Sequence, residues 1–181
     1  MGSPKALLKI GDETFAECVA RKAKEAGIQS IYLVAGRDQE EIKKHLPSDF
    51  YFVKNEDYIR GQISSLQKGI QQVPDETAAV LVWPVDQPLI QEETIRHLIE
   101  TYQRTQRALT IPVYQLKKGH PVIYSKRAMK SALKLTSQQT GKDLQSLYVT
   151  ETHLVEVDDP AILIDIDTPE DYSQYITERR L

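Results

Sequence analysis

The chain has 181 residues, of which 40% are hydrophobic and 27% are charged, and its formal net charge is -3. This size and balance predict one globular domain, residues 1–181, able to bury its own core. The negative charge argues against general attraction to nucleic acid or anionic membranes. No apolar run approaches the roughly 20 residues that cross a bilayer, and no secretory signal pattern is present, so we expect a cytoplasmic protein. With Cys18 as the single cysteine, an internal disulfide and a thiolate metal cluster are excluded.

Helical and strand patterns alternate through the first two thirds of the chain. Thr14 and Glu17 have the spacing of a capping box, and the apolar stripe that follows ends before Gly27, which predicts a helix. The next segments are expected, in chain order, to be a strand at 31–35, a helix at 39–46, a strand at 51–53, a helix at 62–72, a strand ending near Trp83, a helix through Ile95, Leu98, Ile99 and Tyr102, and a strand at 109–114. This alternation predicts a three-layer α/β/α fold with a mostly parallel, doubly wound, Rossmann-like sheet.

The pattern changes from about Gln115. Residues 115–150 are expected to form an insert that carries binding loops, with a hairpin at 117–124, a helix at 126–135 and a polar stretch at 136–142. Strands are expected again at 153–157 and 162–166. Thr168 as N-cap and Pro169 as first helical residue then predict a final helix.

Acidic residues follow two of the predicted strands. Asp86 lies between Pro84 and Pro88 after a buried apolar run, and Asp165 and Asp167 end the strand near the C-terminus. In open α/β sheets, ligands bind beyond the carboxyl ends of the strands, where the loops diverge. Asp86 on its own is more simply explained as a turn residue. The second acidic strand end favours a binding site instead.

Five segments occur in the order and spacing of a known family. They are Met1-Gly-Ser-Pro-Lys5-Ala-Leu-Leu8, Gly61-Gln-Ile-Ser-Ser-Leu66, Asp86-Gln-Pro-Leu-Ile90, Gly119-His-Pro-Val-Ile123 and Asp165-Ile-Asp-Thr-Pro-Glu-Asp-Tyr172. Over essentially the whole chain, this pattern resembles the MobA-like nucleotidyltransferases, and most nearly the molybdenum cofactor cytidylyltransferases among them. The resemblance implies a sheet of the nucleotide-diphospho-sugar transferase type and an enzyme that joins CTP to molybdopterin and releases pyrophosphate.

One feature departs from the family pattern. In the family, a strand and a Gly-rich loop, Leu-Ala-Ala-Gly-x-x-x-Arg, precede the first of these segments and wrap the triphosphate, whereas this sequence begins at Met1. The neighbouring strands should then have unpaired backbone groups. Three outcomes are open: the flanking strands pair directly, a partner chain fills the gap, or Met1 is an internal residue of a longer protein. We favour the last, and therefore expect a domain truncated at its N-terminus.

The resemblance also implies which residues carry the chemistry. Mg²⁺ is held best by one or two carboxylates together with phosphate oxygens, and Asp86 and Asp167 match the metal ligands of the family. Asp165 lies on the same side of an extended strand as Asp167, so it is either a further ligand or a turn acid. Lys5 matches the lysine that contacts the nucleotide phosphates, although by itself it would be an ordinary solvated side chain.

Two further groups are candidates for substrate binding. Gly61, Ser64, Ser65 and Asn55 are expected to read the base or ribose of the nucleotide, with helix capping and turn formation as the alternative roles. For the acceptor, the resemblance points to Gly119, His120, Pro121 and Lys142. The alternatives are an ordinary loop for His120 and a helix N-terminus with Asp143 for Lys142.

The function predicted from these residues is Mg²⁺-dependent transfer of CMP from CTP to the phosphate of a molybdopterin-type acceptor, by direct attack without a covalent intermediate. Another nucleotide, such as GTP, or a sugar-phosphate acceptor is the alternative within enzymes. The other alternative is a non-catalytic cofactor-binding or assembly protein that has lost the triphosphate loop. A molybdoenzyme or a second copy of the chain is the expected protein partner, with no nucleic acid and no membrane involved.

Overall fold

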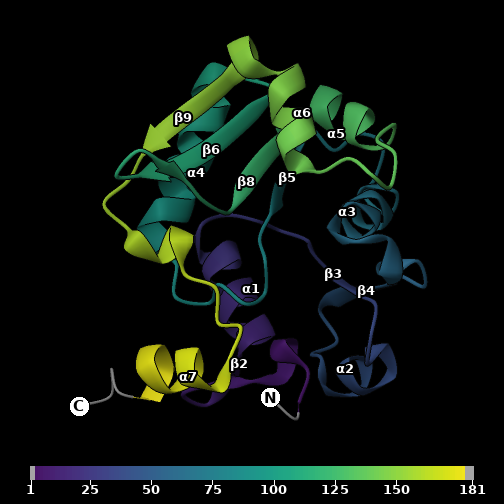
Figure 1. The fold of residues 1–181 in the computed structure, drawn as a ribbon, viewed down its shortest axis with the longest axis vertical. Coiled ribbons are helices and arrows are strands. Elements are labelled where there is room, and N and C mark those ends of the chain that lie inside the picture. The colour runs from purple at the N-terminus through teal and green to yellow at the C-terminus, as the bar shows by residue number, and fades with distance from the viewer. Residues whose placement is uncertain (1–2, 178–181) are drawn as a thin grey trace.

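The computed structural model describes residues 3–177 and contains three sheets in that range. The largest has the strand order β5-β8-β6-β7, with β9 paired to β6. Its strands are β5 (Ala79–Val82), β6 (Leu109–Tyr114), β7 (Lys117–Lys118), β8 (Val122–Ser125) and β9 (Thr152–Glu156). β8 runs antiparallel to β5 and to β6, while β9 runs parallel to β6. The main strands β5, β6 and β9 therefore share one direction, with β8 and the short β7 reversed. Figure 1 shows β9, β6, β8 and β5 side by side in this order.

Helices cover both faces of this sheet. On one face lies α4 (Glu92–Thr105), whose Leu98 and Tyr102 form a buried cluster with Ile123 of β8. The neighbouring β8 residues Val122 and Tyr124 point to the other face and pack in the cluster formed with α3 (Gln62–Ile70), α5 (Lys126–Ala132) and α6 (Gly141–Leu147). Because successive strand residues point to opposite faces, this alternation confirms the predicted three-layer α/β arrangement.

A second, two-stranded sheet is formed by β3 (Ile31–Ala35) and β4 (Phe50–Lys54), which pair in parallel. Two helices flank these strands along the chain, α1 (Phe15–Glu25) before β3 and α2 (Gln39–His45) between β3 and β4. Ala35 packs with Ala16 of α1 and Ile42 of α2 in one buried cluster. These elements agree closely with the ranges expected from the sequence.

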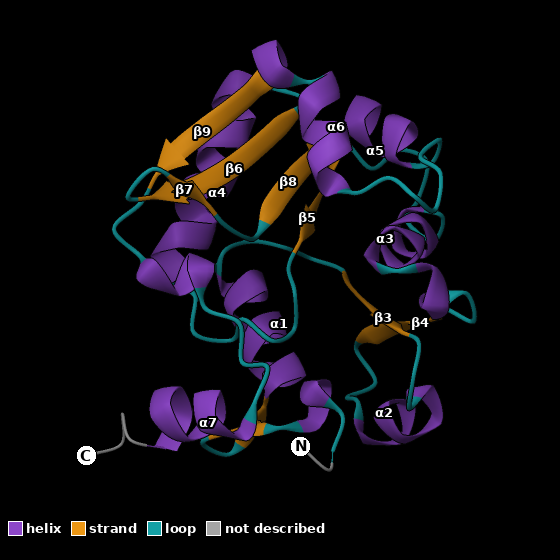
Figure 2. Ribbon diagram, viewed as in Figure 1, coloured by secondary structure: helices purple, strands orange, loops and turns teal. Residues whose placement is uncertain are grey.

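The five-stranded sheet and the β3-β4 sheet do not join within the described residues. There β3 pairs only with β4, and β5 pairs only with β8, so each has one edge without a strand partner (Figure 2). All four residues of β5 are only half-buried, as are four of the five residues of β3. Direct pairing of the flanking strands, one of the three outcomes considered, is therefore not found.

The N-terminal segment leads into α1 through a short 3-10 helix, η1 (Lys5–Leu7), and the antiparallel pair β1 (Lys9–Ile10) and β2 (Glu13–Thr14). Thr14 caps α1 with the predicted capping box, since its Oγ1 accepts from the Glu17 amide and its own amide donates to the Glu17 carboxylate at 2.7 Å. Cys18 is buried in this helix and has no disulfide partner. Within residues 3–177, no helix combines the length and apolar character needed to cross a membrane.

The predicted hairpin at 117–124 is wrong. β7 pairs with the end of β6, through the turn at Gln115 and Leu116, and not with β8. All four residues of β8 are buried, whereas both lysines of β7 are exposed. A strand buried on both faces belongs inside the sheet, and β8 accordingly lies between β5 and β6.

The predicted strand at 162–166 is also wrong. Pro160–Leu163 forms a 3-10 helix, η4, because Asp159 accepts a hydrogen bond from the Ala161 amide and Pro160 occupies the first turn. The chain from Ile164 to Asp167 is not assigned to a strand. The final helix, α7 (Pro169–Tyr172), has Thr168 as its N-cap and begins at Pro169, as predicted. It continues into a π-helical turn, η5 (Ser173–Thr177).

Candidate functional site

Lys5, Asp86 and Asp167 meet at one point in the structure. The Lys5 ammonium donates one hydrogen bond to Asp86 Oδ2, at 2.9 Å, and another to Asp167 Oδ1. These residues lie near the N-terminus, in the middle and near the C-terminus of the chain. The three residues expected to act together from the sequence are thus brought together by the fold.

Asp86 and Asp167 are positioned mainly through their backbones. Asp86 follows β5 in a turn closed by a hydrogen bond from the Gln87 amide to the Pro84 carbonyl, at 3.2 Å. The Asp167 amide donates to Asp171 Oδ2 at 3.1 Å, and the Thr168 amide donates to the same oxygen. The capping box of α7 therefore orders the backbone at Asp167, because Asp171 is its acidic member.

The charges of this cluster favour a cation between the two acids. Partial burial lowers the pKa of Lys5, but the hydrogen bonds to Asp167 and Asp86 outweigh it, so the pKa lies above its usual value. The side chains of Lys5, Asp86 and Asp167 are 36%, 23% and 59% exposed. Solvent therefore reaches all three, and the cluster is open to a small ligand.

The donor set of the cluster suits Mg²⁺. Two carboxylates already share one positively charged group, and Mg²⁺ usually takes one or two carboxylates and completes its octahedron with phosphate and water oxygens. Among residues 3–177, no group of three or more His, Cys, Asp or Glu side chains could form a complete protein cage for a metal. The residues present fit a metal that also binds the substrate.

Asp165 is engaged elsewhere. Its Oδ1 accepts from Gln87 Nε2 at 2.7 Å, in place of any bond to Lys5. Gln87 is 3% exposed, and its Oε1 has no hydrogen-bond partner in the described part of the chain. Gln87 follows Asp86 directly, and Asp165 lies two residues before Asp167. The hydrogen bond between Gln87 and Asp165 therefore aligns the two acidic segments.

The loop at Gly119, His120 and Pro121 lies against the segment that leads to Asp165. The His120 amide donates to the Ile162 carbonyl at 3.2 Å, and a Cβ at position 119 would overlap the same carbonyl oxygen. Only glycine permits this approach. Desolvation lowers the pKa of His120, and the nearby negative charges of Asp165 and Asp86 oppose that effect in part. His120 therefore belongs to the surroundings of the acidic cluster.

Lys142 is not joined to this loop. It lies at the start of α6, its side chain is exposed, and its amide donates to the cap Thr140 at 3.2 Å. No hydrogen bond or ion pair connects it with Gly119, His120 or Pro121 within residues 3–177. The alternative role, a capped helix N-terminus that includes Asp143, is what the geometry shows.

The candidate nucleotide-binding residues form a separate network. Asn55 is fully buried, and its Nδ2 donates to Ser64 Oγ at 2.9 Å and to Ser65 Oγ at 3.0 Å. Asn55 Oδ1 accepts from the Asp57 amide, and Ser64 Oγ donates to the Gly61 carbonyl at 2.8 Å. Both N–H donors of the Asn55 amide are thus used in holding the two serines, and its oxygen holds the turn.

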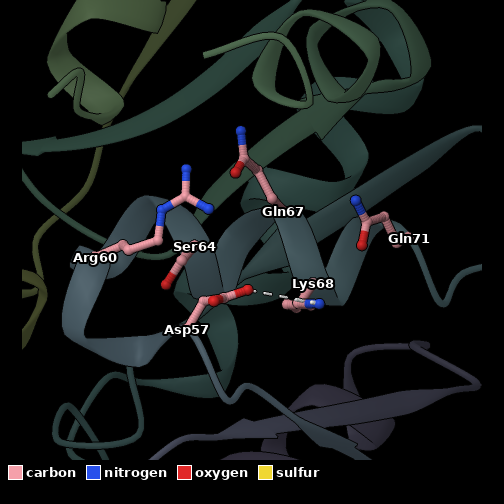
Figure 3. Close-up of a pocket in the computed structure, with 6 residues that line it drawn as sticks. All are labelled: Asp57, Arg60, Ser64, Gln67, Lys68 and Gln71. Carbon is pink, nitrogen blue, oxygen red and sulfur yellow. Dashed lines mark ion pairs between the residues drawn. The ribbon is translucent and has the colours of Figure 1, made fainter. Parts of the chain in front are cut away.

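Ser64 also lines a small polar pocket on α3 and the loop before it (Figure 3). The pocket measures about 130 Å³, and its other lining residues are Asp57, Arg60, Gln67, Lys68 and Gln71. Ligand pockets commonly enclose about 300–1,000 Å³. Lys68 and Asp57 form an ion pair at 3.9 Å across it. None of Lys5, Asp86 or Asp167 lines this pocket, so it is not part of the acidic cluster.

Sequence reasoning missed three residues that support the site. Lys22 Nζ on α1 donates to the carbonyls of Pro88 and Ile90, at 2.7 and 2.8 Å, and so fixes the loop after Asp86. Asp159, 2% exposed, accepts from the Gln91 amide and Thr94 at the start of α4. The third is Gln87, which donates to Asp165. The pair Asp159-Pro160 has the pattern of a helix cap, whereas a lysine on a helix gives no sign of its distant acceptors.

Comparisons with known proteins show the family of the chain. The model of the MobA-like NTP transferase domain matches residues 1–154. The molybdenum cofactor cytidylyltransferase of Escherichia coli K12 is 24% identical over 144 residues, which cover 78% of this chain and 71% of that protein.

Solved structures show the same fold. The crystal structure of Rv0371c from Mycobacterium tuberculosis H37Rv matches with a TM-score of 0.83 and 21% identity, over 98% of this chain and 91% of that one. The complex of Rv0371c with manganese gives a TM-score of 0.78 and 22% identity, over 96% and 91%. The Rossmann-like nucleotidyltransferase fold expected from the sequence is confirmed. The chain belongs to the MobA-like NTP transferase family and is a nucleotidyltransferase.

Proposed function

We propose that the protein transfers CMP from CTP to the phosphate of a molybdopterin-type acceptor in a Mg²⁺-dependent reaction. The observation that carries this proposal is the convergence of Asp86, Asp167 and Lys5 on one point. The similarity to a molybdenum cofactor cytidylyltransferase supports the choice of nucleotide and acceptor.

In this proposal, Asp86 and Asp167 hold the metal. Bound there, Mg²⁺ supplies Lewis-acid stabilisation of the charge on the phosphates. Lys5 lies beside the acids and supplies a positive charge to the leaving pyrophosphate. An oxygen of the acceptor phosphate forms the new bond to the α-phosphorus as the bond to pyrophosphate breaks.

In this proposal, different parts of the chain bind the nucleotide and the acceptor. Gly119, His120 and Pro121 lie beside Asp165 and line the acceptor side in this proposal, with residues 115–150 providing more of that surface. Gly61, Ser64 and Ser65 serve the nucleotide. Asn55 contributes by fixing both serine hydroxyls, because its own amide has no donor left for a ligand. Lys142 remains a candidate acceptor cation.

The test is a panel of nucleotides and acceptors assayed for pyrophosphate release with Mg²⁺. We expect turnover with CTP and molybdopterin, and its loss in Asp86→Asn. If the protein prefers GTP, or a sugar phosphate as acceptor, the proposed substrates are wrong but the protein is still a nucleotidyltransferase. Binding of molybdopterin without turnover of any nucleotide would contradict the proposal and favour a cofactor-binding role.

A further inference from the structure

A single lysine nitrogen occupies the position between the two acids. Two of the three ammonium donors of Lys5 are used, one on Asp86 and one on Asp167. A divalent cation bound by the same pair would lie about 2.0–2.1 Å from its carboxylate oxygens. The ammonium and the metal would then be a few ångströms apart and would repel each other strongly. The ammonium and a bound metal would therefore compete for the two carboxylates.

Lys5 can leave this position without disturbing the fold. Its backbone is fixed, since its carbonyl accepts from the Leu8 amide at 3.1 Å and its neighbour Ala6 is buried. Its side chain is 36% exposed and has a flexible four-carbon stem. No acceptor other than Asp86 and Asp167 binds its Nζ within residues 3–177. A change of rotamer is sufficient to release both acids.

We propose that Lys5 is an exchangeable counterion of Asp86 and Asp167: it holds the cation position in the nucleotide-free protein and competes there with the divalent metal. This inference rests on the metal site of the proposed function. The phosphates of a nucleotide offer the displaced ammonium a new partner. Metal and nucleotide therefore favour each other's binding, and this coupling is reciprocal.

The direct test is a titration of the nucleotide-free protein with Mn²⁺, with free Mn²⁺ followed by electron paramagnetic resonance. Lys5→Met and Lys5→Gln both remove the competing charge, and we expect each to bind Mn²⁺ roughly five- to tenfold more tightly than the wild type, the scale of two partly exposed ion pairs. Lys9→Met is the matched control, because Lys9 is exposed and its Nζ donates only to the Asp12 carbonyl in the part of the chain that the structure describes. It should leave the affinity close to that of the wild type.

Unchanged or weaker Mn²⁺ binding in both Lys5 variants, with binding lost in Asp86→Asn, would overturn the competition and leave the metal site intact. If neither the wild type nor any variant binds Mn²⁺, or if Asp86→Asn binds Mn²⁺ as tightly as the wild type, the metal site itself is overturned and this inference with it. Circular dichroism of each variant verifies that it is folded.

A second measurement uses the unaltered protein. Acetylation by an amine-reactive ester, quantified at each lysine by mass spectrometry, should be slow at Lys5 because its amine is held by two acids. Mg²⁺ alone should raise the labelling of Lys5 several-fold and leave Lys9 unchanged. Equal labelling of Lys5 with and without Mg²⁺, at concentrations where Mn²⁺ binds, would contradict the exchange.

Discussion

The main-chain amide of Ile166 donates a hydrogen bond to the main-chain carbonyl of Asp86, with 2.9 Å between nitrogen and oxygen. This bond joins the segment after β5 to the segment before α7. The side-chain bond from Gln87 to Asp165 reinforces the same contact. Two acids from distant parts of the sequence are thereby placed on one lysine.

Replacing either acid by its amide should abolish most of the nucleotidyl transfer. Asp86→Asn and Asp167→Asn each remove one negative charge from the proposed metal site, and we expect pyrophosphate release to fall on the order of 10²-fold or more. Glu170→Gln is the control, because this exposed acid lies three residues beyond Asp167 and outside the cluster. If Glu170→Gln lowers pyrophosphate release by the same factor, the effect comes from the change in net charge and not from loss of a metal ligand.

A side chain at position 119 should disturb the acceptor loop. Gly119→Ala places a Cβ against the Ile162 carbonyl, and we expect the free energy of unfolding to fall by about 1–3 kcal/mol, measured by urea denaturation. Gly141→Ala is the matched control, since its Cβ would lie 3.8 Å from the Tyr124 hydroxyl, an ordinary contact. Equal stability of the two variants would contradict the close approach.

Lys22→Met should loosen the loop after Asp86. The carbonyls of Pro88 and Ile90 lose their donor, and the free energy of unfolding should fall by about 1–2 kcal/mol near neutral pH. Exposed Lys44→Met should have little effect. A fully stable Lys22→Met would indicate that water replaces the ammonium without cost.

The difference in stability between the wild type and Lys22→Met should depend on pH. Burial lowers the pKa of Lys22 below its unfolded value of about 10.4, so between these two values the unfolded state binds more protons. The stability of the wild type relative to Lys22→Met should therefore rise with pH across this window. A flat difference in urea denaturation up to about pH 10.4 would contradict the assignment.

Glu17 should stabilise α1 only while it is ionised. The Thr14 backbone amide and hydroxyl lower the pKa of Glu17, so its contribution is present above the unfolded value of about 4.3 and is lost as the pH falls through the lower folded value. Glu17→Gln keeps the capping geometry, and we expect it to cost about 0.5 kcal/mol at neutral pH. That difference should vanish in acid. Glu76→Gln, in an exposed loop, should show no such change.

Local structure was predictable wherever neighbouring residues decide it. The capping box at Thr14, the strand at 31–35 and the cap at Thr168 depend on residues within a few positions, and all three are found, although only Ala35 of the strand is buried. The two errors, at 117–124 and 162–166, arose because an apolar run does not reveal its pairing partner. There, burial between β5 and β6 and the cap at Asp159 decided the outcome.

The sequence by itself determined the alternation of helices and strands as far as β6, the family and the identity of Lys5, Asp86 and Asp167 as candidates, because these depend on residue type and spacing along the chain. Only the tertiary structure decided that the lysine lies between both acids, that Gln87 holds Asp165 and that Lys22 fixes the loop after Asp86. Such contacts join residues far apart in the chain, and packing of the whole core sets their geometry. No local pattern encodes it.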